Sequence, residues 1–273
     1  GNLILPGYDG GGEWGGAAAD PNGILYVNSN EMGWIQTMVP SALANNPAAK
    51  AYQSNCISCH GTDKKGNPLS GYPSLVDISS RKSRTYIQQI INNGKGMMPG
   101  FGHLSSAEKE NILTYISNEV PKEIVASKTK GYQPPYQMTG YNKFLDSKGL
   151  PALSPPWGTL NAIDLNTGKY LWKIPFGDEP ALAQKGITGT GAENYGGPII
   201  TASGLLIIGA AKDGKLRFYE SKTGKLLRAI QLPAAAFATP STYLVNGKQF
   251  IVIACGGTKL GTPKGNKYVA FSL

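Results

Sequence analysis

The chain has 273 residues, of which 41% are hydrophobic and 16% charged, with 36 glycines, 19 prolines and a formal net charge of +9 at pH 7. This composition can form a core in every part of the chain and favours short strands joined by tight turns over an all-helical protein. The basic residues are scattered, without an arginine-rich stripe or a nucleic-acid-binding motif, and no run of 18 apolar residues occurs. We therefore expect no nucleic-acid partner and no transmembrane segment in this chain. The positive charge is compatible with simple solubility or with an acidic redox partner.

Residues 1–39 contain glycine pairs and short apolar runs, such as residues 23–27, which are typical of strands and turns. The chain starts at Gly1 without a signal-peptide pattern. We therefore expect it to be part of a larger, exported protein.

Residues 41–120 have the spacing of helices. A short helix is expected over residues 48–55, and a second over residues 84–93 that stops before Gly94. A third helix is expected to begin at Ser105, because Ser105 followed by Glu108 matches a capping box. The apolar residues that the second and third helices place on one face are Ile87, Ile90, Ile91, Ile112, Leu113 and Ile116.

The segment Cys56-Ile57-Ser58-Cys59-His60 is a C-x-x-C-H motif. Two thiols at this spacing can form thioethers with the vinyl groups of haem, and the adjacent histidine can bind its iron. A zinc site would need a second pair of ligands, and only His103 and Cys255 remain. A redox-active dithiol would need a βαβ setting, which the sequence lacks. The motif therefore predicts one covalently attached haem c, held by Cys56 and Cys59, with His60 on the iron.

A second iron ligand is expected from the loop at residues 94–101, which contains Met97-Met98-Pro99. Methionine opposite histidine raises the reduction potential of a haem, which suits electron transfer. This loop resembles the Met-Pro loop of class I cytochromes c, in which the methionine just before proline binds the iron. The resemblance covers residues 41–120 and implies Met98 as the ligand, with Met97 and His103 as alternatives.

Residues 130–156 are rich in proline, glycine and tyrosine, and we expect an extended connector there. After it, residues 160–172 align with residues 216–228, and each copy has an apolar strand, an acidic residue, a Thr-Gly-Lys turn and a second strand. Such a repeat predicts stacked β-sheets, most naturally propeller blades, although two unrelated hairpins would also match. Cys255 follows an apolar run and is expected to be a small buried residue.

Several short motifs flank the helical block. They are Glu13-Trp14-Gly15-Gly16, Asp20-Pro21-Asn22, the strand ending at Trp172, residues 189–199, Ala238-Thr239-Pro240, residues 246–249 and residues 268–271. As an ordered set they resemble the C-terminal part of the membrane glucose dehydrogenase type of quinoprotein dehydrogenases, which depend on pyrroloquinoline quinone (PQQ) and fold as eight-bladed propellers. The resemblance implies a β-propeller portion with an inserted all-α class I cytochrome c domain. The expected domains are propeller strands at residues 1–39, the inserted domain and linker at 40–130, and C-terminal blades at 131–273.

The resemblance also implies a function. The chain would belong to a periplasmic quinohaemoprotein that oxidises a sugar or an alcohol and passes electrons from PQQ to haem c and on to an external cytochrome or quinone. Ca²⁺ and PQQ are expected in the full-length protein, with the catalytic aspartate and most metal ligands upstream of Gly1. The alternatives are an electron carrier or a redox sensor on a propeller that binds no quinone.

Four residues beside glycine pairs are candidates for the quinone pocket: Glu13, Trp14, Asn194 and Tyr195. An indole such as that of Trp14 can stack on a planar quinone. The alternative for Trp14 is a buried residue that docks one blade on the next, and this is the role expected for Trp172 with its turn residues Asp164, Thr167 and Gly168.

Overall fold

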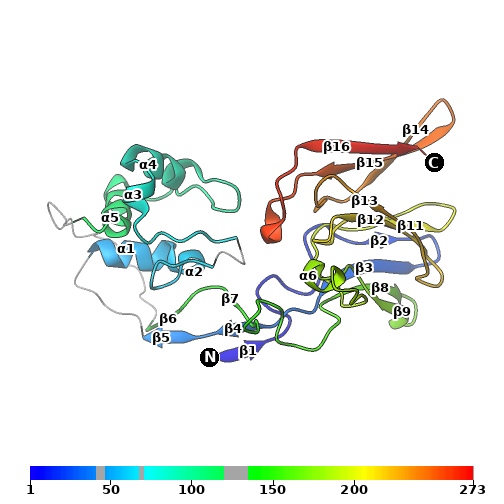
Figure 1. The fold of residues 1–273 in the computed structure, drawn as a ribbon, viewed down its shortest axis with the longest axis horizontal. Coiled ribbons are helices and arrows are strands. Elements are labelled where there is room, and N and C mark those ends of the chain that lie inside the picture. Colours follow the sequence, from blue (N-terminus) through cyan, green and yellow to red (C-terminus); the bar gives the residue numbers. More distant parts are fainter. Residues whose placement is uncertain (41–46, 68–70, 120–134, 273) are drawn as a thin grey trace. The chain divides into compact units, whose positions relative to one another are not determined.

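A computed structural model describes residues 1–40, 47–67, 71–119 and 135–272 (Figure 1). Its residue contacts divide the chain into two compact units. The helical unit consists of Gly1–Asn2 and Ile35–Asn142, and the strand unit consists of Leu3–Trp34 and Lys143–Leu273. The chain crosses between the units within three short strands, namely β1 (Asn2–Ile4), β4 (Trp34–Gln36) and β7 (Asn142–Lys143). No helix in the described ranges combines the length and apolarity needed to cross a membrane.

The helical unit is built on a small apolar core. Its helices are α1 (Pro47–Asn55), α2 (Ile57–His60), α3 (Ile78–Arg81), α4 (Arg84–Asn93) and α5 (Ser106–Ile116), and β5 (Met38–Pro40) pairs with β6 (Tyr136–Met138). Helix α1 packs on α5, where the rings of Tyr52 and Tyr115 lie 4.9 Å apart. The buried core residues of the unit include Tyr52, Cys56, Ile87, Ile91, Ile112, Leu113 and Ile116.

Local sequence signals account for the ends of two helices. Helix α4 ends at Gly94, whose φ of +75° lies in the left-handed region that favours glycine. Helix α5 begins after Ser105, which accepts a hydrogen bond from the Glu108 amide while the Glu108 carboxylate accepts one from the Ser105 amide. Both helix predictions and the capping box are therefore confirmed, although Ile90 is only partly buried.

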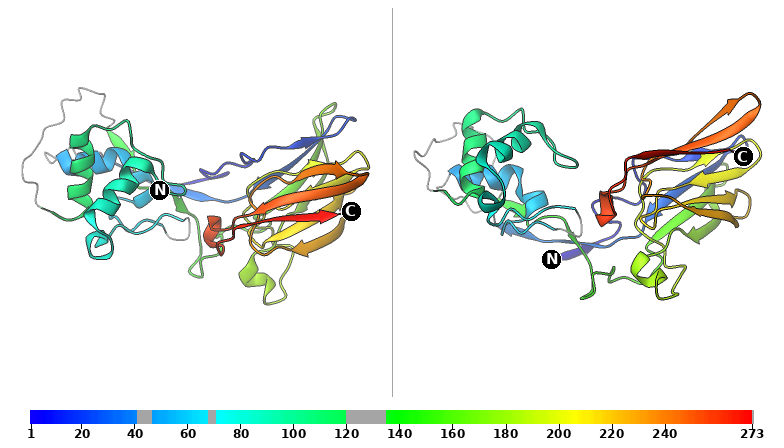
Figure 2. Two further views of the ribbon diagram at one scale, coloured as in Figure 1. Left: turned by 90° about the horizontal axis from the view of Figure 1, so that it is seen from above. Right: turned by 45° about the horizontal axis from the view of Figure 1, so that its top comes forward.

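The strand unit consists of antiparallel sheets stacked face to face (Figures 1 and 2). The first sheet has the order β2 (Ala18–Ala19), β3 (Ile24–Asn30), β8 (Gly158–Asp164), β9 (Lys169–Pro175). The second has the order β10 (Ile199–Ile200), β11 (Leu205–Ile208), β12 (Lys215–Glu220), β13 (Leu226–Gln231). The third contains β14 (Ser241–Val245), β15 (Lys248–Cys255) and β16 (Lys267–Ser272). A short helix α6 (Pro180–Ala183) and a 3₁₀ turn η2 (Lys259–Gly261) lie in the loops.

The first sheet is completed by strands from both sides of the helical segment. Strand β3 pairs with β8 over its whole length, from Ile24 opposite Asp164 to Asn30 opposite Gly158. The helical segment is thus inserted between two neighbouring strands of one sheet. Because each strand needs a partner for its backbone hydrogen bonds, the two flanks form one sheet.

The internal repeat is a structural repeat. Residues 160–172 form β8 and β9, and residues 216–228 fall in β12 and β13, the third and fourth strands of successive sheets. Each pair has a register shift at the same place, between Ala162 and Ile163 in one copy and between Phe218 and Tyr219 in the other. A shared bulge at one offset argues against two unrelated hairpins, so stacked sheets are confirmed.

Alternate residues of β11 fill the two spaces between sheets. Leu206 and Ile208 pack toward the first sheet, against Leu160, and Ile207 packs toward the third sheet. Cys255 is buried in this second space, as predicted.

Trp172 joins the first sheet to the second. Its indole Nε1 donates a hydrogen bond of 2.8 Å to the carbonyl oxygen of Ser221. A Cβ atom at Gly224, where φ is +69°, would lie 2.9 Å from the indole ring, so the turn must remain glycine for the ring to approach. The predicted docking role of Trp172 is therefore confirmed.

We expect Trp172→Ala to lower the free energy of unfolding by about 3 kcal/mol, because it removes aromatic packing and leaves a cavity between sheets. Tyr170→Ala is the matched control, since Tyr170 lies on the same strand with 60% of its surface exposed, and it should change stability by less than about 0.5 kcal/mol. Equilibrium unfolding in urea measures both, and equal effects would show that Trp172 does not dock the sheets.

Candidate functional site

The haem-attachment motif folds as one helical turn. Helix α2 follows Cys56, and the amides of Cys59 and His60 donate hydrogen bonds to the Cys56 carbonyl at 3.3 and 2.9 Å. Gly61, with a φ of +74°, ends the turn. This turn brings the two thiols and the imidazole into one place, with Cys56 and His60 buried and Cys59 partly exposed.

The ring of His60 is oriented by a backbone contact. Its Nδ1 lies 2.9 Å from the carbonyl oxygen of Pro73. A neutral imidazole that donates through Nδ1 keeps the lone pair of Nε2 for a metal. Burial also lowers the pKa of His60, which favours the neutral form that a metal requires.

The surroundings of the thiols suit a thioether better than a thiolate. Burial raises the pKa of Cys56 to about 12 and also raises that of Cys59. Redox-active dithiols need a depressed thiol pKa, and zinc needs thiolates, whereas a thioether carries no charge. Within the described ranges, no group of three or more His, Cys, Asp or Glu residues could hold a metal ion. The residues present therefore fit a covalent haem.

The methionine loop presents Met97 and Met98 differently. Lys95 and Met98 exchange backbone hydrogen bonds of 2.9 and 3.1 Å, which closes a tight turn after Gly94. The side chain of Met98 is partly buried and packs against the apolar core that contains Cys56, whereas Met97 is 48% exposed. His103, the other alternative, is exposed before α5, with its ring 6.0 Å from that of Phe101.

The four candidate quinone-pocket residues all lie in the strand unit, where amide side chains connect their segments. Asn30 on β3 donates to the Glu13 carboxylate and to the Asn194 carbonyl, each at 3.0 Å. Asn194 in turn accepts a 2.6 Å hydrogen bond from Asn28 and donates to the carbonyls of Ser29 and Ala192. Asn194 is buried and engaged on both its amide oxygen and its amide nitrogen, so its structural effect is to hold the loop before β10 against β3.

The other three candidates differ in exposure. Trp14 is 70% exposed, so the expectation that it could be a buried docking residue is wrong for this chain. The backbone of the neighbouring Gly15 packs against that of Gly196. A Cβ atom on Gly15 would lie 2.0 Å from the carbonyl carbon of Gly196, so this close contact requires glycine next to Trp14. Tyr195 is buried, with its ring 6.1 Å from that of Phe237.

Glu13 has an unusual electrostatic environment. Burial, with the nearby Asp9 carboxylate, raises its pKa from 4.5 to about 7, against the opposing effects of Asn30 and Lys259. Burial and Asp9 also raise the pKa of Tyr195, which keeps its hydroxyl protonated. Glu13 can therefore exchange a proton near neutral pH.

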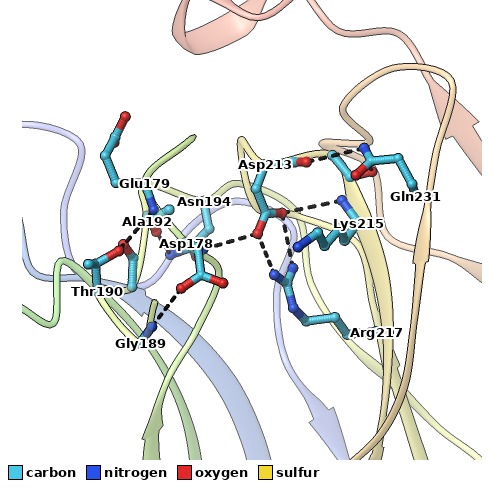
Figure 3. A network of polar contacts seen from close by, with 12 residues as sticks. Asp178, Glu179, Gly189, Thr190, Ala192, Asn194, Asp213, Lys215, Arg217 and Gln231 are labelled. Carbon is cyan, nitrogen blue, oxygen red and sulfur yellow. Dashed lines mark hydrogen bonds and ion pairs between the residues drawn. The ribbon is translucent and has the colours of Figure 1, made fainter. Parts of the chain in front are cut away.

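A second polar network lies in the loops that follow β9 and β11 (Figure 3). Asp213 accepts hydrogen bonds from the amides of Asp178 and Lys215 and is paired with the buried guanidinium of Arg217. Asp178 accepts a 2.7 Å hydrogen bond from the Gly189 amide. Sequence reasoning missed this network, although Arg217, which stands between the apolar Leu216 and Phe218 of β12, is a signal that a buried partner exists.

Two family models match the chain. The PQQ family model, which describes the β-propeller domain of glucose/ethanol/alcohol dehydrogenases, matches residues 88–251. The model of cytochrome c oxidase, cbb3-type, subunit III matches residues 44–116. The two ranges overlap over residues 88–116, and the propeller match continues through β8 to β14 and into β15.

Curated relatives resemble the chain over part or all of its length. It is 40% identical to the quinoprotein glucose dehydrogenase of Escherichia coli K12 over 57% of this chain and 21% of that protein. It is 27% identical to a probable quinate dehydrogenase (quinone) of Xanthomonas campestris pv. juglandis, over 100% of this chain and 27% of that protein. It is 26% identical to the quinohemoprotein alcohol dehydrogenase of Comamonas testosteroni, over 72% of this chain and 25% of that protein. The chain thus spans about a quarter of the length of these relatives.

The solved structure of the Comamonas testosteroni protein aligns over 93% of this chain and 24% of that chain, with 15% identity and a TM-score of 0.44. The propeller model alone covers more than half of the chain, and the two matched families imply PQQ and haem c as cofactors. The chain therefore belongs to the family of PQQ-dependent glucose, ethanol and alcohol dehydrogenases, and its stacked sheets are part of that family's β-propeller domain.

Proposed function

We propose that the chain is the C-terminal part of a periplasmic quinohaemoprotein dehydrogenase that oxidises a sugar or an alcohol. In this proposal the helical unit, Gly1–Asn2 and Ile35–Asn142, contains an inserted class I cytochrome c domain, and the strand unit, Leu3–Trp34 and Lys143–Leu273, belongs to the propeller. Apart from Gly1–Asn2, the helical unit begins before residue 40 and ends after residue 130, the expected bounds of the insertion, because β5 pairs with β6 within it. The observation that carries the proposal is the one-turn motif in which Cys56, Cys59 and an oriented His60 come together within a chain of the PQQ-dependent family.

Four residues of the helical unit would bind the haem in this proposal. Cys56 and Cys59 would hold the haem through thioethers, and His60 would bind the iron through Nε2 while Pro73 fixes its ring. Met98 would be the second iron ligand, because its side chain packs against the core that contains Cys56. The haem supplies one-electron chemistry when bound, and a methionine ligand favours its reduced form.

In the strand unit, Glu13, Trp14, Asn194 and Tyr195 would line the PQQ pocket. PQQ supplies two-electron oxidation of the substrate hydroxyl when bound. Trp14 offers an exposed indole face for stacking, and Asn194 and Gly15 hold the backbone beneath it. The catalytic aspartate and the Ca²⁺ ligands would come from the part of the protein upstream of Gly1, and the external acceptor would be another cytochrome or a quinone.

The test is equilibrium binding of PQQ to the complete gene product, with and without Trp14→Ala. Loss of the stacking surface should weaken PQQ binding about 10-fold, since an aromatic stack contributes about 1 kcal/mol or more. Tyr268→Ala is the control, because Tyr268 is an aromatic residue of the third sheet that is 83% exposed. If the wild-type protein shows no saturable PQQ binding, the proposal fails and an electron carrier on a quinone-free propeller becomes the better description.

A further inference from the structure

Glu13 is held in a fixed position within the strand unit. Its carboxylate oxygen Oε1 accepts a hydrogen bond from the buried Asn30 side chain, and its carbonyl accepts one of 3.1 Å from the Gly16 amide. The turn at residues 13–16 therefore contains both Glu13, which is half-buried, and Trp14, which is exposed. A carboxylate held this way cannot swing freely into solvent to relieve its burial.

Three charged residues act on Glu13, one from its own loop and two from distant parts of the chain. Asp9 raises the pKa of Glu13, Lys259 lowers it, and Glu193 has the smallest effect, a further rise. Glu193 is itself paired with the buried Lys143 at 2.5 Å. Burial raises the pKa of Tyr195, and Asp9 raises it further.

Lys259 is placed by a turn with unusual backbone geometry. Its flanking residues Thr258 and Leu260 have φ values of +67° and +57°, a conformation that residues with side chains seldom adopt. The turn puts the Lys259 ammonium 3.6 Å from the centre of the Tyr195 ring, a cation–π contact. A cation is thereby held beside the acidic pair of Asp9 and Glu13 while the Tyr195 hydroxyl remains neutral.

We propose that Glu13 is the proton-exchanging residue of the quinone pocket, taking up a proton from solvent when the anionic quinone binds and returning it when the quinone leaves. This inference rests on the proposed function, since it places PQQ beside Trp14. PQQ carries carboxylates, and added negative charge favours the neutral form of a nearby carboxyl group. The proton adds to the Glu13 carboxylate, so one negative charge is removed from the pocket as the ligand brings in its own.

Proton uptake can be measured by isothermal titration of PQQ into the complete, haem-loaded protein in buffers of different ionisation enthalpy. Glu13 has a pKa of about 7, and a rise of about one unit on binding predicts an uptake of about half a proton per PQQ near about pH 7.5. Glu13→Gln should still bind PQQ measurably but should lose this uptake, because an amide does not titrate.

Two further variants give opposite shifts that a merely structural role would not produce. Asp9→Asn removes a charge that raises the pKa of Glu13, so the pH of maximal uptake should fall. Lys259→Met removes a charge that lowers this pKa, so the maximum should move to higher pH. Shifts in the same direction, or none, would overturn the inference.

A ligand-free measurement separates this inference from the proposed function. The folded-state pKa of Glu13 lies above its ordinary value of 4.5, so its stabilising contribution is complete below pH 4.5 and is lost as the pH rises toward 7. The stability of the wild type should therefore fall relative to Glu13→Gln across this window, as urea unfolding would measure. If the stabilities of the wild type and Glu13→Gln depend on pH in the same way, or if Glu13→Gln takes up as many protons as the wild type, the role of Glu13 is wrong while the proposed function stands. Absence of PQQ binding in the wild type, with the stability difference intact, would instead overturn the proposed function.

Discussion

The haem absorbance should remain with the polypeptide after full denaturation and extraction with acidified acetone, provided that the protein is made in a host with c-type cytochrome maturation. Thioether bonds from Cys56 and Cys59 survive unfolding, whereas a haem held only by His60 and methionine is released when the fold is lost. The one-turn geometry of α2 brings both thiols and the imidazole together, as double attachment requires.

The double variant Cys56→Ala/Cys59→Ala should give the opposite result, with any haem colour extracted into the solvent. Cys255→Ala is the matched control, because it removes the buried thiol of the third sheet and should leave the haem attached. If the wild-type protein also loses its colour to the solvent, the haem is not covalently bound, and the interpretation of the motif is wrong.

Met98→Ala should abolish the sulfur-to-iron charge-transfer band at the red end of the ferric spectrum and lower the reduction potential of the haem. Methionine sulfur stabilises ferrous iron, so replacing it with water or another donor favours the ferric state. The burial of Met98 against the core that contains Cys56 is the structural reason for choosing this residue.

Met97→Ala is the matched control, because it removes the same type of side chain from the neighbouring position. The Met97 side chain is 48% exposed, so this change should leave both the charge-transfer band and the reduction potential unaltered. Loss of the band in Met97→Ala with retention in Met98→Ala would exchange the two assignments. Retention in both would make His103 the candidate, and His103→Ala would then be the decisive variant.

Features that depend on neighbours in the chain could be read from the sequence. The capping box of Ser105 and Glu108, the stop of α4 at Gly94 and the turn from Cys56 to His60 each involve groups within four residues of one another. Their chemistry is local, so residue type and spacing suffice. The same holds for the repeat, whose two copies share even the position of their bulge.

Identical residue types in different surroundings could not be separated by sequence. Trp14 and Trp172 both stand near glycine-containing turns, yet one is exposed and the other donates a hydrogen bond to the next sheet. Met97 and Met98 are adjacent and differ only in which side chain faces the core. Exposure depends on which distant segment covers a side chain, and local patterns carry no such information.

The sequence by itself determined the chemistry of the helical segment: a C-x-x-C-H turn, capped helices and a methionine loop. Only the tertiary structure decided how the flanks combine, because β3 pairs with β8 across the whole inserted segment. That pairing brings Asn28 and Asn30 to Asn194, and Asn30 to Glu13, so the charge state of Glu13 depends on residues far apart in the chain. Hydrogen bonding and burial act through space. For this reason, the raised pKa of Glu13 could not be predicted from its place in the sequence.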